Sequence, residues 1–208
     1  MKYPFFASFL ILCALFYHNI KKSSRNDTIS KQAFWDRENK ANNTRKQPLD
    51  KLDYIRIPLD RLPTDICTDD ETIKSCLSDL RILAEESIVN FTGITNTDLK
   101  LEYGAANLPF LQKCDLSYTH LTRVLDEWSS RLLELNQTDE ALTVLEYAVE
   151  IKADISNIYY KAADIYLERN TPDKINHLID RIASTNSIIK KSIISNLENR
   201  LDKKEIQP

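Results

Sequence analysis

The feature that most constrains the fold is a helical pattern of apolar residues that occurs twice at one fixed interval. The pairs, all separated by the same interval, are Leu125–Tyr159, Leu132–Tyr166, Ala141–Ile175, Leu145–Ile179 and Ala148–Ile182. A fixed period of this length, about 34 residues, is typical of stacked helix–turn–helix units, and we call it the repeat interval. The pattern therefore predicts an array of α-helices from about Thr119 to Ile182.

Each predicted unit contains two apolar stripes at helical spacing, separated by a short polar break. In the first unit the break is Asn136-Gln137-Thr138, whose side chains suit the N-terminus of the next helix. In the second unit it is Asn170-Thr171-Pro172, where the Thr suits an N-cap and the Pro suits the first helical position. We therefore expect two helical hairpins, over residues 119–152 and 153–186.

The second hairpin resembles the tetratricopeptide repeat, a family of stacked helical hairpins. Tyr159, Ala163 and Tyr166 occupy the places where that motif has a bulky residue, a small residue and a Tyr. With the first hairpin included, the resemblance covers roughly a third of the chain. It implies an all-α fold of TPR-like hairpin repeats, capped by the flanking helices.

The first hairpin matches the same motif less completely. Ser129 stands at the small place and Leu132 replaces the Tyr, although Ala141 and Ala148 are kept. Neither hairpin has the closing Pro of the motif. An ordinary antiparallel four-helix arrangement with a coincidental interval is the alternative. An all-α fold is expected under either arrangement.

The resemblance also implies a binding surface, because in this family the first helices of successive units line a groove that binds peptide segments. The groove residues that it implies are Arg123, Asp126 and Ser130 from the first unit and Asn157, Tyr160, Asp164 and Glu168 from the second. All seven lie off the apolar stripe, so we expect them to be exposed. A solvated polar face with no partner is the alternative, since surface helices generally have one.

The chain starts with an apolar stretch, from Tyr3 to Tyr17, and no charge follows it before Lys21. With its flanking residues it is just long enough to cross a membrane, which takes roughly 17 residues or more. No small-residue cleavage site follows, so we expect an uncleaved, single-pass transmembrane anchor over residues 1–20. The alternative is a cleaved signal on an exported, extracytoplasmic helical protein with a structural or unrecognised enzymatic role.

Charge is distributed unevenly along the chain. A basic linker is expected over residues 21–51, and between 21 and 50 it has eight Lys/Arg against four Asp/Glu. Positive charge on this side of the anchor predicts a cytoplasmic C-terminal part at the cell membrane. The whole chain has a net charge of −3, so the remainder is acidic and does not favour nucleic acid as a partner.

The sequence before the hairpins predicts the first part of a single domain over residues 52–204. Residues 52–59 alternate apolar and polar side chains and, with the residues up to Pro63, predict an extended arm over 52–63, which Pro58 limits to an edge strand at most. A capping box, Thr68–Glu71, is expected to begin a helix that ends near Ser87.

Three further elements are expected around the hairpins. Asn96 or Thr97 should cap a short helix that Gly104 closes. Pro109 is expected in a loop or turn before a helix that begins near Asp115. An amphipathic helix over residues 187–203 is expected to cover the open end of the array, because two repeats alone bury too little surface.

No pattern in the chain indicates catalysis. The two glycines, Gly93 and Gly104, cannot form a phosphate-binding loop or a nucleophile elbow. Cys114 and His120 are six residues apart and do not share a helix face, so no zinc site is expected. We expect no enzymatic activity, no cofactor, no metal and no small-molecule substrate. The expected function is a membrane-anchored adaptor or scaffold that binds a protein or peptide partner through the groove.

Overall fold

The computed structural model describes residues 31–205 and the side chains as far as residue 202, and the described chain forms two compact units. The first unit contains the described residues up to Gln47 together with Asn96–Asn107. The second contains Pro48–Thr95 and the chain from Leu108 onward. The fold is predominantly helical, which confirms the all-α prediction.

The expected membrane anchor over residues 1–20 lies outside the described residues. Within the part of the chain that is described, none of the helices combines the length and apolar character needed to cross a bilayer.

The first unit consists of a helical segment over residues 31–42, helix α3 (Asn96–Tyr103) and a 3-10 turn, η1 (Ala105–Asn107). Lys100 of α3 forms an ion pair with Glu38 and holds the pKa of that carboxyl below its usual value. Gly104 ends α3 with φ +88°, and its N–H donates to the Lys100 carbonyl at 2.8 Å. This confirms the expected glycine C-cap.

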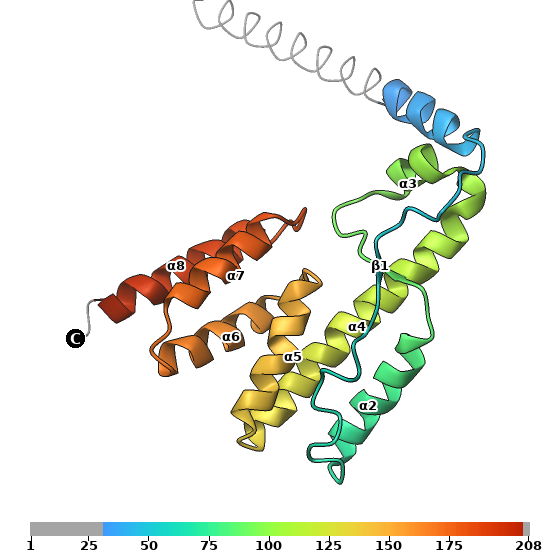
Figure 1. Ribbon diagram of the computed structural model, residues 1–208. Helices are drawn as coiled ribbons and strands as arrows, with labels where there is room; N and C mark the ends of the chain where they lie inside the picture. The colour runs from blue at the N-terminus through green and yellow to red at the C-terminus, as the bar shows by residue number, and fades with distance from the viewer. Residues whose placement is uncertain (1–30, 206–208) are drawn as a thin grey trace, which may run out of the picture. The chain divides into compact units, whose positions relative to one another are not determined.

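The second unit is built around α4 (Leu108–Glu134), a helix of 27 residues. Helices α2 (Glu71–Ala84) and α5 (Thr138–Glu150) both pack against it (Figure 1). The face of α4 that they cover carries four fully buried large side chains, Leu121, Leu125, Trp128 and Leu132. Burial of these side chains supplies the main hydrophobic stabilisation of the packing.

The start of α4 differs from the prediction. Pro109 is the second residue of the helix and does not lie in a preceding loop, so the expected start near Asp115 is wrong. A proline is tolerated in the first turn because the N–H that it lacks has no acceptor inside the helix. The additional N-terminal turns bury Leu111 and Cys114.

The extended arm is confirmed in part: Tyr54–Ile55 form one strand of a small sheet, and the chain turns at residues 59–62. Strand β1 (Tyr54–Ile55) pairs antiparallel with β2 (Ile88–Val89), with Tyr54 opposite Val89. Strand β2 in turn packs on α4, and both of its side chains are buried.

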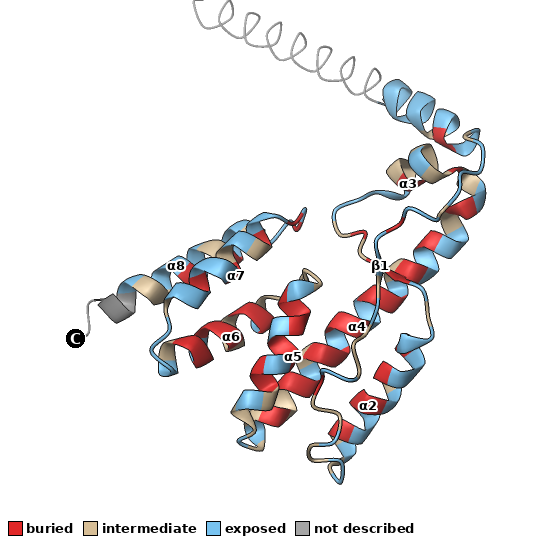
Figure 2. Cartoon of the chain, in the orientation of Figure 1, coloured by how far each residue is buried: buried red, intermediate tan, exposed pale blue. Residues whose placement is uncertain are grey.

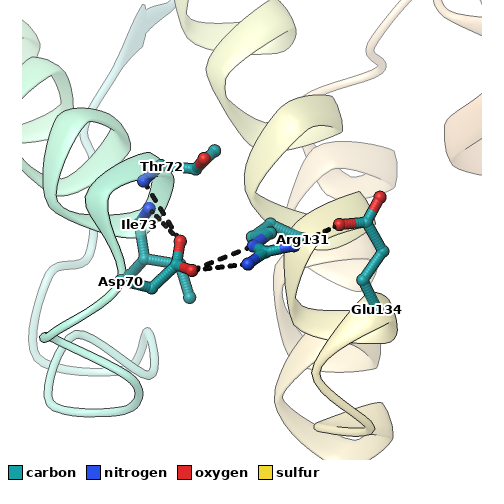
Figure 3. Close-up of polar contacts among 5 residues, drawn as sticks. All are labelled: Asp70, Thr72, Ile73, Arg131 and Glu134. Carbon is teal, nitrogen blue, oxygen red and sulfur yellow. Dashed lines mark hydrogen bonds and ion pairs between the residues drawn. The ribbon is translucent and has the colours of Figure 1, made fainter.

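The N-terminus of α2 is capped by Asp70, so the predicted capping box beginning at Thr68 is wrong. The Asp70 carboxylate accepts from the N–H groups of Thr72 and Ile73 at 3.1 and 3.2 Å. Figure 3 shows the second role of this carboxylate, which accepts from Nε and Nη2 of Arg131 on α4 at 3.0 and 2.7 Å. Arg131 also bonds Glu134 at 2.6 Å. The helix ends at Ala84, short of the expected Ser87.

Helices α6 (Ser156–Glu168), α7 (Asp173–Ala183) and α8 (Lys190–Glu205) follow α5. Helix α6 packs on α5, and α8 packs on both α6 and α7 (Figure 1). The tail is therefore helical as expected, although it begins at Lys190. The breaks do not supply the expected side-chain caps: α5 and α7 have none, and the Thr171 hydroxyl donates back to the Tyr166 carbonyl at 3.2 Å.

The α4–α5 and α6–α7 turns have the same geometry. Asn136 and Asn170, one repeat interval apart, have left-handed φ values of 59° and 57°. The next residue donates to a carbonyl five residues back in both turns, from Gln137 to Leu132 and from Thr171 to Tyr166, each at 2.9 Å. This is the Schellman type of helix ending, which places one residue in the left-handed conformation. Gly is the most common residue at that position, and Asn also occurs there.

Helices α4, α6 and α8 bury side chains in the same register. Leu125, Tyr159 and Ile193 are fully buried and follow one another at the repeat interval. The same spacing relates Ser129, Ala163 and Leu197, which are also fully buried. Figure 2 shows the buried residues gathered along α4, α5 and α6. The polar sides of α4, α6 and α8 lie off these buried positions, which recur at the repeat interval.

Candidate partner-binding surface

The seven groove residues predicted from the sequence lie on the polar sides of α4 and α6, and their exposure differs. The four that are exposed are Arg123, Asn157, Asp164 and Glu168. The three that are half-buried, against expectation, are Asp126, Ser130 and Tyr160. Burial in each case results from a neighbouring charged side chain that the sequence pattern did not single out. We call the surface that these residues share with the equivalent side of α8 the α4–α6–α8 face.

Lys161 of α6 covers Asp126 and Ser130 of α4. Its Nζ donates to the Asp126 carboxylate and carbonyl, both at 2.8 Å, and to the hydroxyls of Ser129 and Ser130 at 2.7 and 2.8 Å. The Lys161 side chain is only 17% exposed. Burial lowers the pKa of Lys161, while the Asp126 carboxylate opposes that change. Asp126 and Ser130 are therefore engaged within the protein.

Arg200 of α8 covers Tyr160 and Asp164 of α6 in a similar way. Its guanidinium carbon lies 5.1 Å from the centre of the Tyr160 ring, within the range of a cation–π contact. The same guanidinium forms an ion pair with Asp164, and its Nε donates to Asn196 at 2.8 Å. Tyr160 and Asp164 thus join α6 to α8.

Three of the predicted residues stay available to a partner. Arg123, Asn157 and Glu168 are exposed, and none of their side chains has a hydrogen bond or ion pair with another described residue. Two further exposed residues of α8, Lys191 and Glu198, lie one repeat interval beyond Asn157 and Asp164. The free part of the α4–α6–α8 face therefore carries charges of both signs.

Neither Lys161 nor Arg200 was identified from the sequence. The sequence did contain a signal for Lys161, which follows the position one repeat interval after Asp126 by a single residue. From there a long side chain can reach the polar side of α4. For Arg200 the signal was the place of α8 in the same register as α6, which sets its basic side chain against Asp164.

The two buried thiols of the second unit are not arranged for nucleophilic chemistry. Burial raises the pKa of Cys76 to about 12 and also raises that of Cys114. Both are therefore protonated at neutral pH, whereas the thiolate is the reactive form. Among the described residues, no three His, Cys, Asp or Glu side chains gather as a metal-binding group.

Comparison with known proteins finds no match: no protein family, no curated protein and no solved structure is similar to this chain. Its function is therefore inferred from its own residues.

Proposed function

We propose that this protein is a membrane-anchored interaction module that binds a protein or peptide segment through the α4–α6–α8 face. The two hairpins, α4–α5 and α6–α7, act as TPR-like units, and α8 supplies the first helix of a further unit. The observation that carries the proposal is the common register of the three helices, marked by the fully buried Leu125, Tyr159 and Ile193. On this proposal the polar sides of the three helices form one surface, and the ion pairs of Lys161 with Asp126 and of Arg200 with Asp164 support it.

The polar contacts between neighbouring helices support a preformed surface. Lys161 ties α6 to α4, and Arg200 ties α8 to α6. A partner therefore meets side chains that are already ordered, which reduces the conformational entropy lost on binding. Exposed charges of both signs at Arg123 and Glu168 favour a partner of mixed charge, since complementary charges set orientation and specificity.

The membrane part of the proposal rests on the sequence. The apolar stretch from Tyr3 to Tyr17 anchors the chain, and the basic residues that follow leave the helical units in the cytoplasm. The anchor then confines binding to the inner surface of the cell membrane.

Site-specific photo-crosslinking in intact membranes tests the proposal. A photoreactive residue replaces one exposed side chain at a time, at Asn157 or Glu168 on the α4–α6–α8 face. Matched control positions are Thr143 on α5 and His177 on α7, which are also exposed and lie on the second helices of the hairpins. We expect a discrete adduct from the first pair and none from the second.

Charge reversal tests whether the exposed charges of the α4–α6–α8 face contribute to partner binding. Because Arg123 and Glu168 have no described partner, Arg123→Glu and Glu168→Lys should leave the thermal midpoint unchanged and reduce the adduct formed at Asn157. Adducts of equal yield at Thr143 or His177, or adducts that both charge reversals leave intact, would show that this face does not bind the partner.

A further inference from the structure

A polar cleft of about 360 Å³ lies in the second unit, away from the α4–α6–α8 face. Four segments that are distant in the sequence form its walls: the arm around β1, the loop that follows β2, the C-terminal end of α5 and the turn between α7 and α8. Its charged lining residues are Asp53, Arg56, Arg61, Glu150 and Lys152. Its volume is in the range of sites for small organic molecules.

The walls of the cleft are held in place by contacts of their own. The Tyr147 hydroxyl donates to the Arg56 carbonyl at 3.3 Å and fixes the arm against α5. The Tyr118 hydroxyl donates to the Lys152 carbonyl at 2.9 Å and fixes the turn after α5. A side chain at Gly93 would meet the Asn186 carbonyl at 2.6 Å, so the loop after β2 and the α7–α8 turn are in close contact. The cleft is therefore a built feature and not a gap between loose segments.

Cations predominate in the lining of an otherwise acidic protein. The chain has a net charge of −3, yet three of the five charged lining residues are Arg56, Arg61 and Lys152. None of these three side chains forms an ion pair within the described part of the chain. The Asn186 side chain also lines the cleft, and its amide can donate hydrogen bonds, whereas the Asn90 amide and the Ser184 hydroxyl already donate to Tyr118 and to the Arg181 carbonyl.

The backbone at Lys152 is unusual for a lysine. Its φ is 61°, and it closes α5 with the same Schellman bonding as the other two turns, with Ala153 N–H donating to the Ala148 carbonyl at 2.9 Å. At the equivalent position those turns have Asn136 and Asn170, a residue type that tolerates the left-handed conformation. A lysine disfavours it. The turn that faces the cleft therefore has a lysine at a backbone position that is better suited to Gly or Asn.

We propose that this cleft binds a small organic anion, whose phosphate or carboxylate group is held between Lys152 and the two arginines of the arm. The arm approaches the anion from one wall and the α5–α6 turn from another, so the group bridges them. Asp53 and Glu150 leave a single net positive charge on the lining, which suits one compact anionic group and not a polyanion. This site is independent of the partner surface proposed above.

The substitution Lys152→Gly tests the site without the usual ambiguity of a lost fold. Glycine is favoured at φ 61°, so this variant should unfold at the same or a higher temperature than the original chain. Binding to the full-length chain is measured by calorimetry with inorganic phosphate and with succinate, each against chloride at matched ionic strength. We expect saturable binding of one of the two probes, and the one that binds identifies the head group. Loss of one charged hydrogen bond should weaken it about tenfold or more.

Two controls separate a specific site from a general effect of charge. Asn136→Gly introduces glycine at the same left-handed position in a turn outside the cleft. Lys191→Gln removes a positive charge from an exposed position on α8. Both should bind the anion as the original chain does, while Arg61→Gln should weaken binding as Lys152→Gly does. Absence of saturable binding of either probe, or equal binding by Lys152→Gly and Asn136→Gly, would overturn the proposal. The crosslinking result for the partner surface is unaffected by either outcome.

Discussion

Two of the buried tyrosines of the second unit, Tyr118 and Tyr159, should respond in opposite ways to the same chemical change. Tyr118 on α4 is 3% exposed and Tyr159 on α6 is fully buried, so Tyr→Phe removes a hydroxyl from the interior in each case. Their hydroxyl groups differ in hydrogen bonding. Tyr118 donates to the Lys152 carbonyl and accepts from Asn90 Nδ2, both at 2.9 Å. The Tyr159 hydroxyl has no hydrogen-bond partner among the described residues.

The expected magnitudes follow from these contacts. Tyr118→Phe removes two good hydrogen bonds and leaves the Lys152 carbonyl and Asn90 amide less satisfied. At about 1 kcal/mol for each bond, the free energy of unfolding should fall by about 2 kcal/mol. Tyr159→Phe removes a desolvated hydroxyl that gains no bond on folding, so the free energy of unfolding should rise by about 1 kcal/mol. The two variants should differ by about 3 kcal/mol.

Chemical denaturation of the full-length chain, followed by tryptophan fluorescence, measures the difference. Trp128 is fully buried beside this core and reports its exposure on unfolding. The slope of the unfolding free energy against denaturant concentration should be equal in the two variants. The difference between their midpoints therefore gives the difference in stability. A loss of stability in Tyr159→Phe as large as in Tyr118→Phe would refute the hydrogen-bond assignment, because both changes are of the same size.

Three further outcomes are expected. Leu197→Ala on α8 should lower the free energy of unfolding by about 3 kcal/mol, because Leu197 is fully buried. Chemical denaturation measures this, and an unchanged midpoint would mean that α8 does not cover the array. Asp70→Asn should destabilise the protein at neutral pH but not in acid. The hydrogen bond from Arg131 lowers the pKa of Asp70 in the folded protein. The stabilisation that the Asp70 carboxylate gives to the fold is therefore complete above about pH 4 and is lost as the pH falls through the lower folded-state pKa. Thermal unfolding from pH 7 to pH 3 tests this, and a constant difference would contradict it. Gly93→Ala should cost more than about 1 kcal/mol, since Gly93 has φ +78° and its new Cβ would lie 2.6 Å from Asn186; an unchanged thermal midpoint would contradict this.

The sequence by itself determined the helical composition and the inward face of each helix. Periodicity is a local property, so Leu125 and Tyr159 could be assigned to buried stripes without knowledge of their neighbours, and both are fully buried. The left-handed turns at Asn136 and Asn170 coincide with the predicted breaks for the same local reason. Helix starts were less predictable. Pro109 and Thr68 each suit more than one position near a helix end, and the choice depends on contacts such as that of Asp70 with Arg131.

Only the tertiary structure decided which polar side chains meet. The sequence identified the polar sides of α4 and α6 but could not show that Lys161 covers Asp126 or that Arg200 covers Asp164, because the two members of each pair belong to different helices. Pairing between helices depends on how they pack, since their offset sets which side chains come within reach. The polar cleft is the clearest case. Arg61 and Lys152 belong to segments with no common pattern, and they line one cavity because the arm folds back against the end of α5.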